Sequence, residues 1–300
     1  MTRAPHADAA AGDLINVALA DLHPTQPSLG YDEVFFRVGR YTLEAPSPVF
    51  DAWCGANGQG AMEAVNPGAT VADHASFTCQ VPIGSETPET TAGMKTAVIG
   101  PGGQVYLTDG HHTLTSFWEV PGGGPSAHIR LRVVANLKHL GPETFWREMA
   151  SQGWTWLHQA DGEPARSEHV PASLGLKNFT NDAYRGVMFF LRDVSYFQDD
   201  SIPAFQEFYW GYWLRNQTDP GLRLENFDLN DVSSYHALLG NVAQAMIALP
   251  DDIEIEGLTA RQLGKLTSFG QTAFDALSAP LDSPNPGKLS YSMAYKAAHS

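Results

Sequence analysis

Cysteine, basic residues and long hydrophobic runs are all scarce in this chain of 300 residues. The two cysteines, Cys54 and Cys79, form no CxxC pair, which excludes zinc-ribbon and thioredoxin-type sites. No apolar run approaches the roughly 20 residues that a membrane-spanning helix needs, so we expect no membrane partner. A Walker loop, a GxGxxG run and a Gly-x-Ser-x-Gly elbow are also missing, so P-loop, Rossmann and serine-hydrolase functions have no residue support.

The shortage of basic residues argues against one class of partner. Eighteen Lys and Arg stand against 33 Asp and Glu, a formal net charge of -15. Tight binding of duplex DNA requires clustered cations that neutralise phosphates, and only Arg130, Arg132 and Lys138 come close together in the sequence. We therefore expect no tight binding of duplex DNA, and a small ligand in preference to a long polyanion.

The cysteines and the N-terminus leave the compartment open. A single disulfide between Cys54 and Cys79 would fit an exported protein, whereas two thiols would fit a cytoplasmic one. The first residues, MTRAPHADAAAGD, have no apolar core of the signal-peptide type. The chain as written is therefore expected to be cytoplasmic, and an exported, periplasmic form whose signal peptide has been removed is the alternative.

Alternation of polar and apolar residues predicts strands in the first half of the chain. The segments 104–108 and 128–133 have this pattern, and the mainly apolar segments 14–19 and 95–99 predict two further strands. Helical periodicity at 31–38 and after 109 adds helices to them, while 46–91 is loop-dominated. The predicted fold class is α+β, with a small mixed sheet in a domain of residues 13–140.

After Gly141-Pro142 the composition becomes helical and rich in aromatic residues, which predicts a second, helical domain at 141–300 packed on the first. The expected helices are those at 182–191, 203–215, 235–249 and 259–266, followed by a surface tail over the last twenty residues. The aromatic stripe 205–213 fits core packing, with a base-stacking or sugar-binding platform as the alternative. Arginines in these helices are expected to pair with buried acids: Arg185, Arg192 and Arg215 with Asp182, Asp193 or Glu207.

The most informative stretch is Gln104–Val120, QVYLTDGHHTLTSFWEV. A short alternating strand leads into the turn pair Asp109-Gly110, and Leu114, Phe117 and Trp118 then recur at helical spacing. The polar residues of the turn therefore lie at a helix N-terminus, where backbone N–H groups and the helix dipole attract anions.

Three interpretations of this turn remain open. In the first, a loop of Gly110, Thr113 and a histidine donor, His111 or His112, binds phosphate. In the second, Asp109 and the histidines hold a divalent metal that activates water, although the spacing matches no zinc-helix motif. In the third, Asp109 caps the helix and the histidines bond to backbone, so that the turn is structural.

Two further residues are candidates for the same site. Lys95 lies at the start of the strand that pairs with the motif strand, where its charge can neutralise a phosphate. Glu33, on the short helix after Pro27, is a candidate general base. Each has an ordinary alternative: a solvated lysine at a strand end and a solvated carboxylate on a helix.

Three separated blocks of the chain resemble one family. They are Asp21-Leu22-His23-Pro24-Thr25-Gln26 with Gly30-Tyr31-Asp32-Glu33-Val34; Lys95–Thr113 with its Leu107-Thr108-Asp109-Gly110-His111-His112-Thr113; and Asn181-Asp182-Ala183-Tyr184-Arg185 with Phe205–Arg215. In order and content they are similar to the ParB-like nuclease family, over about residues 13–215. That family is similar to the ParB and sulfiredoxin superfamily, whose fold is a small mixed sheet with a phosphate-binding loop at a helix N-terminus.

The resemblance implies that Asp109, Gly110, His111, His112 and Thr113 form this phosphate-binding loop, with Glu33 and Lys95 as secondary site residues. Superfamily members bind nucleotides, and some are nucleases, nucleotide hydrolases or free-serine kinases. This chain departs from them at Thr113, where several have Arg. It also has no basic helix-turn-helix after the core, as site-specific DNA binding would require, and no sulfiredoxin cysteine in the motif.

The leading hypothesis is a ParB-like nuclease or nucleotide-processing enzyme that hydrolyses phosphate esters or transfers phosphoryl groups. The loop would hold the phosphate, a histidine would donate to it, and Glu33 or Asp109 would act as base or metal ligand. Mg²⁺ is expected if the substrate is a nucleotide, since such sites combine one or two carboxylates with substrate phosphates. The alternatives are a small-molecule kinase of the free-serine type and a non-catalytic protein that binds an anionic ligand.

Overall fold

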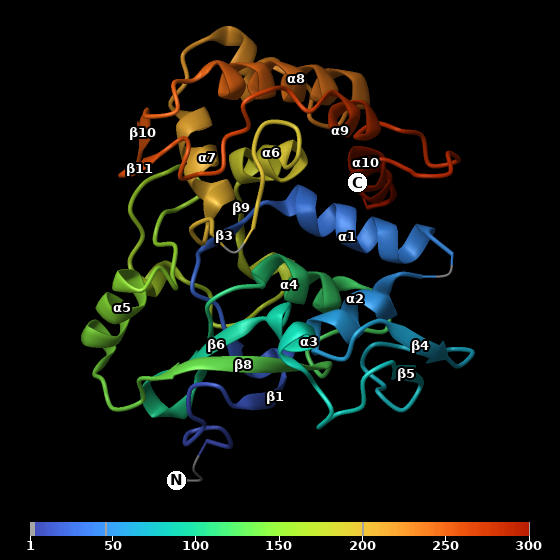
Figure 1. Ribbon diagram of the computed structural model, residues 1–300, viewed down its shortest axis with the longest axis vertical. Helices are drawn as coiled ribbons and strands as arrows, with labels where there is room; N and C mark the ends of the chain where they lie inside the picture. Colours follow the sequence, from blue (N-terminus) through green and yellow to red (C-terminus); the bar gives the residue numbers. More distant parts are fainter. Residues whose placement is uncertain (1–3, 46, 200, 300) are drawn as a thin grey trace. The chain divides into compact units, whose positions relative to one another are not determined.

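The computed structural model describes residues 4–45, 47–199 and 201–299 (Figure 1). Its residues fall into two compact units, which we describe separately. Unit 1 comprises residues 1–27, 40–159 and 164–180, and unit 2 comprises 28–39, 160–163 and 181–300. The fold class is α+β, with a mixed sheet in unit 1, as predicted.

The sheet of unit 1 has five strands (Figure 1). In spatial order they are β1 (Leu14–Ala18), β8 (His128–Asn136), β6 (Thr96–Ile99), β7 (Val105–Leu107) and β2 (Leu22–His23). The pairs β1–β8 and β6–β7 are antiparallel, whereas β6–β8 and β2–β7 are parallel. Each of the four predicted strands is present, because every strand contributes apolar residues to the core.

Helices and short strands complete unit 1. The helices are α2 (Val49–Ala56), α3 (Pro88–Ala92), α4 (His111–Glu119) and α5 (Pro142–Ser151), with short 3-10 turns at Leu19–Asp21, Pro101–Gly103, Ser167–His169 and Leu176–Asn178. Strands β4 (Met62–Val65) and β5 (Phe77–Cys79) form a separate antiparallel pair. A disulfide joins Cys54 of α2 to Cys79 of β5, so the cysteines are paired.

The division into units does not follow the single boundary expected after residue 140. Helix α5, expected in the C-terminal domain, belongs to unit 1 because Phe145 packs against Val98 and Tyr106 of the sheet. The two ring centroids of Tyr106 and Phe145 lie 4.6 Å apart. Residues 28–39, expected in the first domain, have most of their contacts within unit 2.

Unit 2 is largely helical (Figure 1). It contains most of α1 (Tyr31–Leu43) and the helices α6 (Ala183–Leu191), α7 (Gln206–Arg215), α8 (Val232–Ala248), α9 (Gln271–Ala276) and α10 (Lys288–Ala298). Short elements connect them: β3 (Ser28–Leu29), β9 (Thr180–Asn181), β10 (Glu254–Ile255), β11 (Leu258–Thr259) and 3-10 turns at Pro220–Leu222 and Leu224–Asn226. Trp210, Tyr196, Tyr235 and Phe190 are fully buried at the centre of its core.

Three predictions in unit 2 are corrected. Helix α7 begins at Gln206 and not at residue 203, because Phe205 has a left-handed backbone. Residues 259–266 form no helix: Thr259 makes a turn in which its side chain bonds to Gln262, and Gly264 has a positive φ. The expected surface tail contains α10, in which Leu289, Tyr291, Ser292 and Met293 are buried.

The aromatic stripe on α7 packs in the core, and arginines pair with acids beside it. Trp210 is fully buried and its indole N–H donates to the Leu263 carbonyl at 2.9 Å. Arg185 and Arg192 both pair with Glu207, and Arg215 pairs with Asp182 at 2.9 Å. These are the partners expected from the sequence. Over the described ranges, each helix is too short or too polar to cross a membrane.

Candidate functional site

A glycine turn connects β7 to α4 and defines the geometry of the candidate loop, residues 109–113. Gly110 has a φ of 89°, a left-handed conformation that other residues rarely adopt. A Cβ atom at Gly110 would lie 2.5 Å from Cγ and 2.7 Å from Cδ of Lys95, well inside van der Waals contact. Glycine is therefore required both by the backbone angle and by the aliphatic stem of Lys95 that lies against the turn.

Lys95 contributes a positive charge to the loop. Its Nζ is 3.2 Å from Oδ2 of Asp109, whose side chain is 64% exposed. The surrounding desolvation acts to raise the pKa of Asp109, but Lys95, the Gly110 amide and His111 outweigh it, and the pKa is lowered. Asp109 is therefore ionised at neutral pH.

The N-terminus of α4 opens directly from Gly110. The first hydrogen bond of the helix runs from Leu114 N–H to the Gly110 carbonyl at 2.9 Å, and Gly110 offers no side chain as a cap. The N–H groups of a first helical turn have no acceptor within the helix, and the dipole adds partial positive charge there. Together with Lys95, this end of α4 can accept a phosphate or carboxylate, with the half-buried Thr113 in its first turn.

His111 is tied to the neighbouring strand end. Its Nε2 accepts a hydrogen bond from Thr25 N–H at 3.0 Å, and the Thr25 hydroxyl donates to the Leu107 carbonyl at 2.7 Å. Burial lowers the pKa of His111 to about 4, against the opposing charge of Asp109. The imidazole is therefore neutral at pH 7, with Nε2 as acceptor, and it fixes the segment after β2 to the loop.

The other two predicted residues have different surroundings. His112 is buried at the second position of α4, and its carbonyl accepts a hydrogen bond from the Ser116 hydroxyl at 2.8 Å. Glu33 lies in unit 2, where its carboxylate pairs with Arg37 at 2.7 Å and with Arg185 at 2.6 Å. Lys95, Asp109 and Gly110 are thus brought together, whereas Glu33 takes part in a buried ion-pair network of its own unit.

The donor set of the loop fits a metal only together with a ligand. Within the described ranges, no group of three or more His, Cys, Asp and Glu side chains is arranged to hold an ion. Asp109 is a single exposed carboxylate, and Mg²⁺ commonly combines one or two carboxylates with phosphate oxygens of a substrate. Asp109 is therefore the residue that would hold Mg²⁺, and only alongside a bound phosphate.

A cleft that sequence reasoning missed lies at the ends of β2 and β7. These parallel strands pair His23 with Tyr106, and the cleft of about 240 Å³ is lined by His23, Pro24, Tyr106, Trp146, Ser167, Glu168, Val170, Pro171 and Ala172. The aromatic residues come from segments far apart in the chain. The pairing of β2 with β7 brings His23 to Tyr106, and the packing of α5 on the sheet brings Trp146 to Tyr106. No local pattern in the sequence could have revealed either contact.

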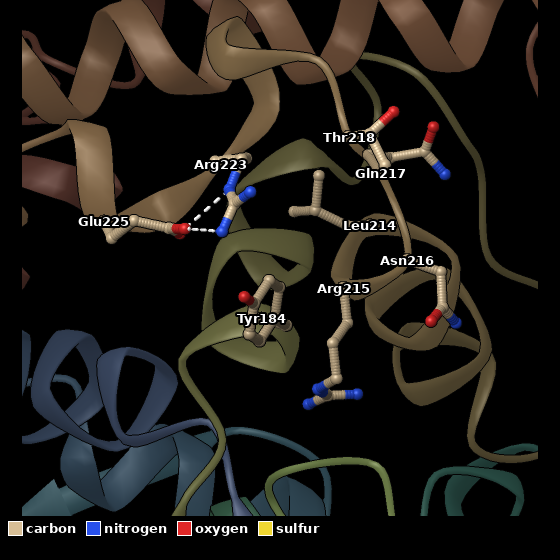
Figure 2. Close-up of a pocket in the computed structure, with 8 residues that line it drawn as sticks. All are labelled: Tyr184, Leu214, Arg215, Asn216, Gln217, Thr218, Arg223 and Glu225. Carbon is tan, nitrogen blue, oxygen red and sulfur yellow. Dashed lines mark hydrogen bonds and ion pairs between the residues drawn. The ribbon is translucent and has the colours of Figure 1, made fainter.

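Unit 2 has a second pocket, of about 280 Å³ (Figure 2). Its lining comes from the start of α6, the end of α7 and the turns that follow: Tyr184, Leu214, Arg215, Asn216, Gln217, Thr218, Arg223 and Glu225. The Arg215 guanidinium lies 4.5 Å from the Tyr184 ring and donates to the Ala160 carbonyl at 2.7 Å. Arg223 pairs with Glu225, so much of the charge in this pocket is already compensated.

Comparisons with known proteins agree with this architecture. The model of the family described as "Putative ParB-like nuclease" matches residues 15–216. Among solved structures, the crystal structure of protein Atu1540 from Agrobacterium tumefaciens is similar, with a TM-score of 0.52 and 20% sequence identity. The similarity covers 79% of this chain and 91% of that one, and at this identity it shows the fold alone. No curated protein matches the chain.

Proposed function

This chain belongs to the ParB-like nuclease family, whose model spans more than half of it, and we propose that it is an enzyme of phosphate-ester chemistry. The substrate is a nucleotide or a similar small phosphate, and the reaction is hydrolysis or phosphoryl transfer. Its phosphate binds at residues 109–113 and Lys95. The small size of the substrate follows from the strongly acidic composition, which opposes binding of a long polyanion.

One observation carries the proposal: the stem of Lys95 lies against Gly110, so that a lysine charge and the N-terminus of α4 converge at one turn. Each feature alone is a weak anion site. Their combination supplies a mobile cation and oriented N–H donors for the same phosphate. Thr113, where several superfamily members have Arg, leaves Lys95 as the cation of the loop in this proposal.

The proposed roles of Asp109 and His111 follow from their protonation and partners. Asp109 has a lowered pKa and is a weak proton acceptor at pH 7, so we assign it to orient water or to hold a cation that accompanies the phosphate. Bound Mg²⁺ would neutralise charge on the phosphate. His111 is a positioning residue because Nε2 is bonded to Thr25. We assign proton donation to His112, the neighbouring histidine of the first helical turn.

The decisive variant is Lys95→Met, which keeps the aliphatic stem against Gly110 and removes only the charge. In assays of nucleotide hydrolysis with Mg²⁺, we expect a loss in kcat/KM of about 100-fold, the scale of one charge-assisted contact in a transition state. Lys138→Met is the matched control, since Lys138 pairs with Asp8 at an exposed position. Equal activity of Lys95→Met and Lys138→Met would overturn the proposal.

Histidine variants and product analysis then separate the alternatives. We expect the double variant His111→Ala, His112→Ala to lose nuclease and nucleotide-hydrolase activity, and His112→Asn alone to reproduce most of that loss with normal folding. Phosphoserine formed from serine and a nucleotide would identify a kinase of the free-serine type. Saturable binding of an anion by calorimetry, without turnover of any phosphate compound, would identify a binding protein.

A further inference from the structure

The cleft beside the ends of β2 and β7 has aromatic rings on several sides. The ring centroids of His23 and Tyr106 are 5.0 Å apart with planes inclined by 31°, and those of Tyr106 and Trp146 are 5.9 Å apart at 85°. Tyr106 and Trp146 are each only half buried, although both pack on Phe145. Part of each aromatic side chain is therefore left to face a ligand in about 240 Å³ of space.

Polar groups stand at the border of the same cleft. The exposed carboxylate of Glu168 and the hydroxyl of Ser167 line it from the 3-10 turn Ser167–His169. Burial lowers the pKa of His23, against Asp21 and a hydrogen bond with Gln104, so its imidazole is neutral at pH 7. The cleft thus offers aromatic side chains and hydrogen-bond acceptors, and its one charged lining side chain is an acid.

From this arrangement we propose that the cleft binds the planar ring of a nitrogen heteroaromatic compound that carries an amino group, of which an aminated nucleobase is the representative. The ring packs against Tyr106 and Trp146, because flat π systems gain most from stacked or edge-on aromatic contacts. The amino group donates to the Glu168 carboxylate, which the acceptor-only chemistry of an ionised carboxylate favours. A ring with a carbonyl in place of the amino group presents an acceptor to Glu168 and binds less well.

The position of the cleft connects it to the phosphate loop. Asp109 follows Tyr106 by three residues, so the chain between them spans at most about 11 Å. On the other wall, Pro24 precedes Thr25, which is bonded to both His111 and Leu107. One ligand with a ring and a phosphate can therefore reach both places. That combined binding rests on the proposed function, whereas ring binding by the cleft does not.

The test uses adenosine, which has the amino-bearing ring and no phosphate, titrated into the full-length protein by calorimetry. We expect saturable binding, weakened about tenfold or more in Trp146→Leu, the effect of losing one ring contact. Trp154→Leu is the matched control: Trp154 packs on the same Val98, Phe145 and Met149 cluster but lies outside the cleft lining. We expect it to bind adenosine as the unaltered protein does.

Inosine and Glu168→Gln test the polar half of the proposal without disturbing the core. Inosine, which has a carbonyl in place of the amino group, is expected to bind more weakly than adenosine, and Glu168→Gln to reduce that difference. Lys95→Met is expected to leave adenosine binding unchanged, so that failure of the phosphate proposal and failure of this one are distinguishable. Absence of adenosine binding to the unaltered protein, or equal affinity for inosine and adenosine, would overturn the proposal.

Discussion

Among the residues of the loop 109–113, His111 shows most clearly how burial and a hydrogen bond fix the protonation state of a side chain. Its imidazole is buried, and the N–H of Thr25 points at Nε2. A proton on Nε2 would place two donors against each other at a buried position. Folding therefore holds His111 in its neutral form, and protonation of His111 destabilises the folded protein.

We predict a loss of stability in weak acid that depends on His111. Its pKa of about 4 in the folded protein lies below the ordinary value of 6.5, so the unfolded chain takes up the proton first. The contribution of His111 is fully present above pH 6.5 and is lost as the pH falls toward 4, on the order of 3 kcal/mol. The measurement is the free energy of unfolding in urea at a series of pH values.

His111→Gln supplies the comparison, because the amide oxygen of glutamine can accept from Thr25 N–H and does not titrate. Burial also lowers the pKa values of His23 and His74, which contribute equally to both proteins. We expect the variant to be somewhat less stable at pH 7 and to lose less stability on acidification. Parallel curves for the two proteins would show that His111 is not held neutral by Thr25.

At the scale of elements, the disulfide organises the segment that the sequence left as a loop-dominated insertion. It closes 25 residues between α2 and β5, and strand β4 lies within that span. Phe50 and Trp53 of α2 pack against Phe77 of β5 at 4.9 and 5.1 Å between ring centroids. Aside from these contacts the segment is poor in buried residues, so the covalent link carries much of its order.

We predict that reduction of this disulfide loosens α2, β4 and β5 while the five-stranded sheet persists. Closing a loop of 25 residues in the unfolded chain is worth about 3 kcal/mol. Urea unfolding and limited proteolysis, each with and without a reductant, measure the effect. Cleavage confined to about residues 57–95 in the reduced protein is the expected pattern, and Cys54→Ala with Cys79→Ala should reproduce it. Identical unfolding midpoints in both conditions would contradict the prediction.

Features of the fold that arise from local sequence patterns were predicted, whereas features that depend on contacts between distant residues were not. The four strands and α4 were predicted because alternation and helical spacing are local signals. The helix predicted at 259–266 was wrong because Thr259 forms a turn with Gln262 that resembles the start of a helix. The helix Lys288–Ala298 was not predicted because it follows a proline-rich stretch. Capping residues alone do not distinguish a turn from the start of a helix, because the core against which a helix packs is not visible in the sequence.

The candidate site shows the same limit. The turn at Gly110 and the approach of Lys95 follow from a strand pairing that the sequence predicted. The bond between His111 and Thr25 joins residues 86 positions apart, and the pairing of His23 with Tyr106 depends on a two-residue strand. Neither leaves a periodic pattern. Sequence reasoning therefore predicted the turn between strand and helix, but it could not foresee the hydrogen bond between His111 and Thr25.

At the scale of the whole molecule, the distribution of charge decides which phosphate compounds can bind. The sequence offered only one dense basic group, and two of its members are neutralised: Arg130 pairs with Glu86, and Lys138 pairs with Asp8 at 2.6 Å. Within unit 2, Arg185, Arg192 and Arg215 are likewise used in ion pairs with Glu33, Glu207 and Asp182. Among the described residues, these ion pairs leave little clustered positive charge to oppose the net charge of -15.

We predict that mononucleotides bind with little dependence on salt and that duplex DNA does not bind tightly. A protein releases roughly one counterion from DNA for each phosphate it neutralises, so a protein with a single loop cation gains little from a long polyanion. Anisotropy titrations with a short labelled duplex, from about 50 to 200 mM salt, measure how the affinity for DNA depends on salt. Calorimetry of a mononucleotide in the same buffers measures the salt dependence of nucleotide binding.

A steep decline of DNA affinity with salt would reveal several phosphate contacts and would indicate a nucleic acid, not a nucleotide, as the substrate. Mononucleotide binding that varies little with salt, and that is lost in Lys95→Met but kept in Lys138→Met, would assign the phosphate contact to the loop. Of these two lysines, Lys95 is the one whose side chain lies against Gly110.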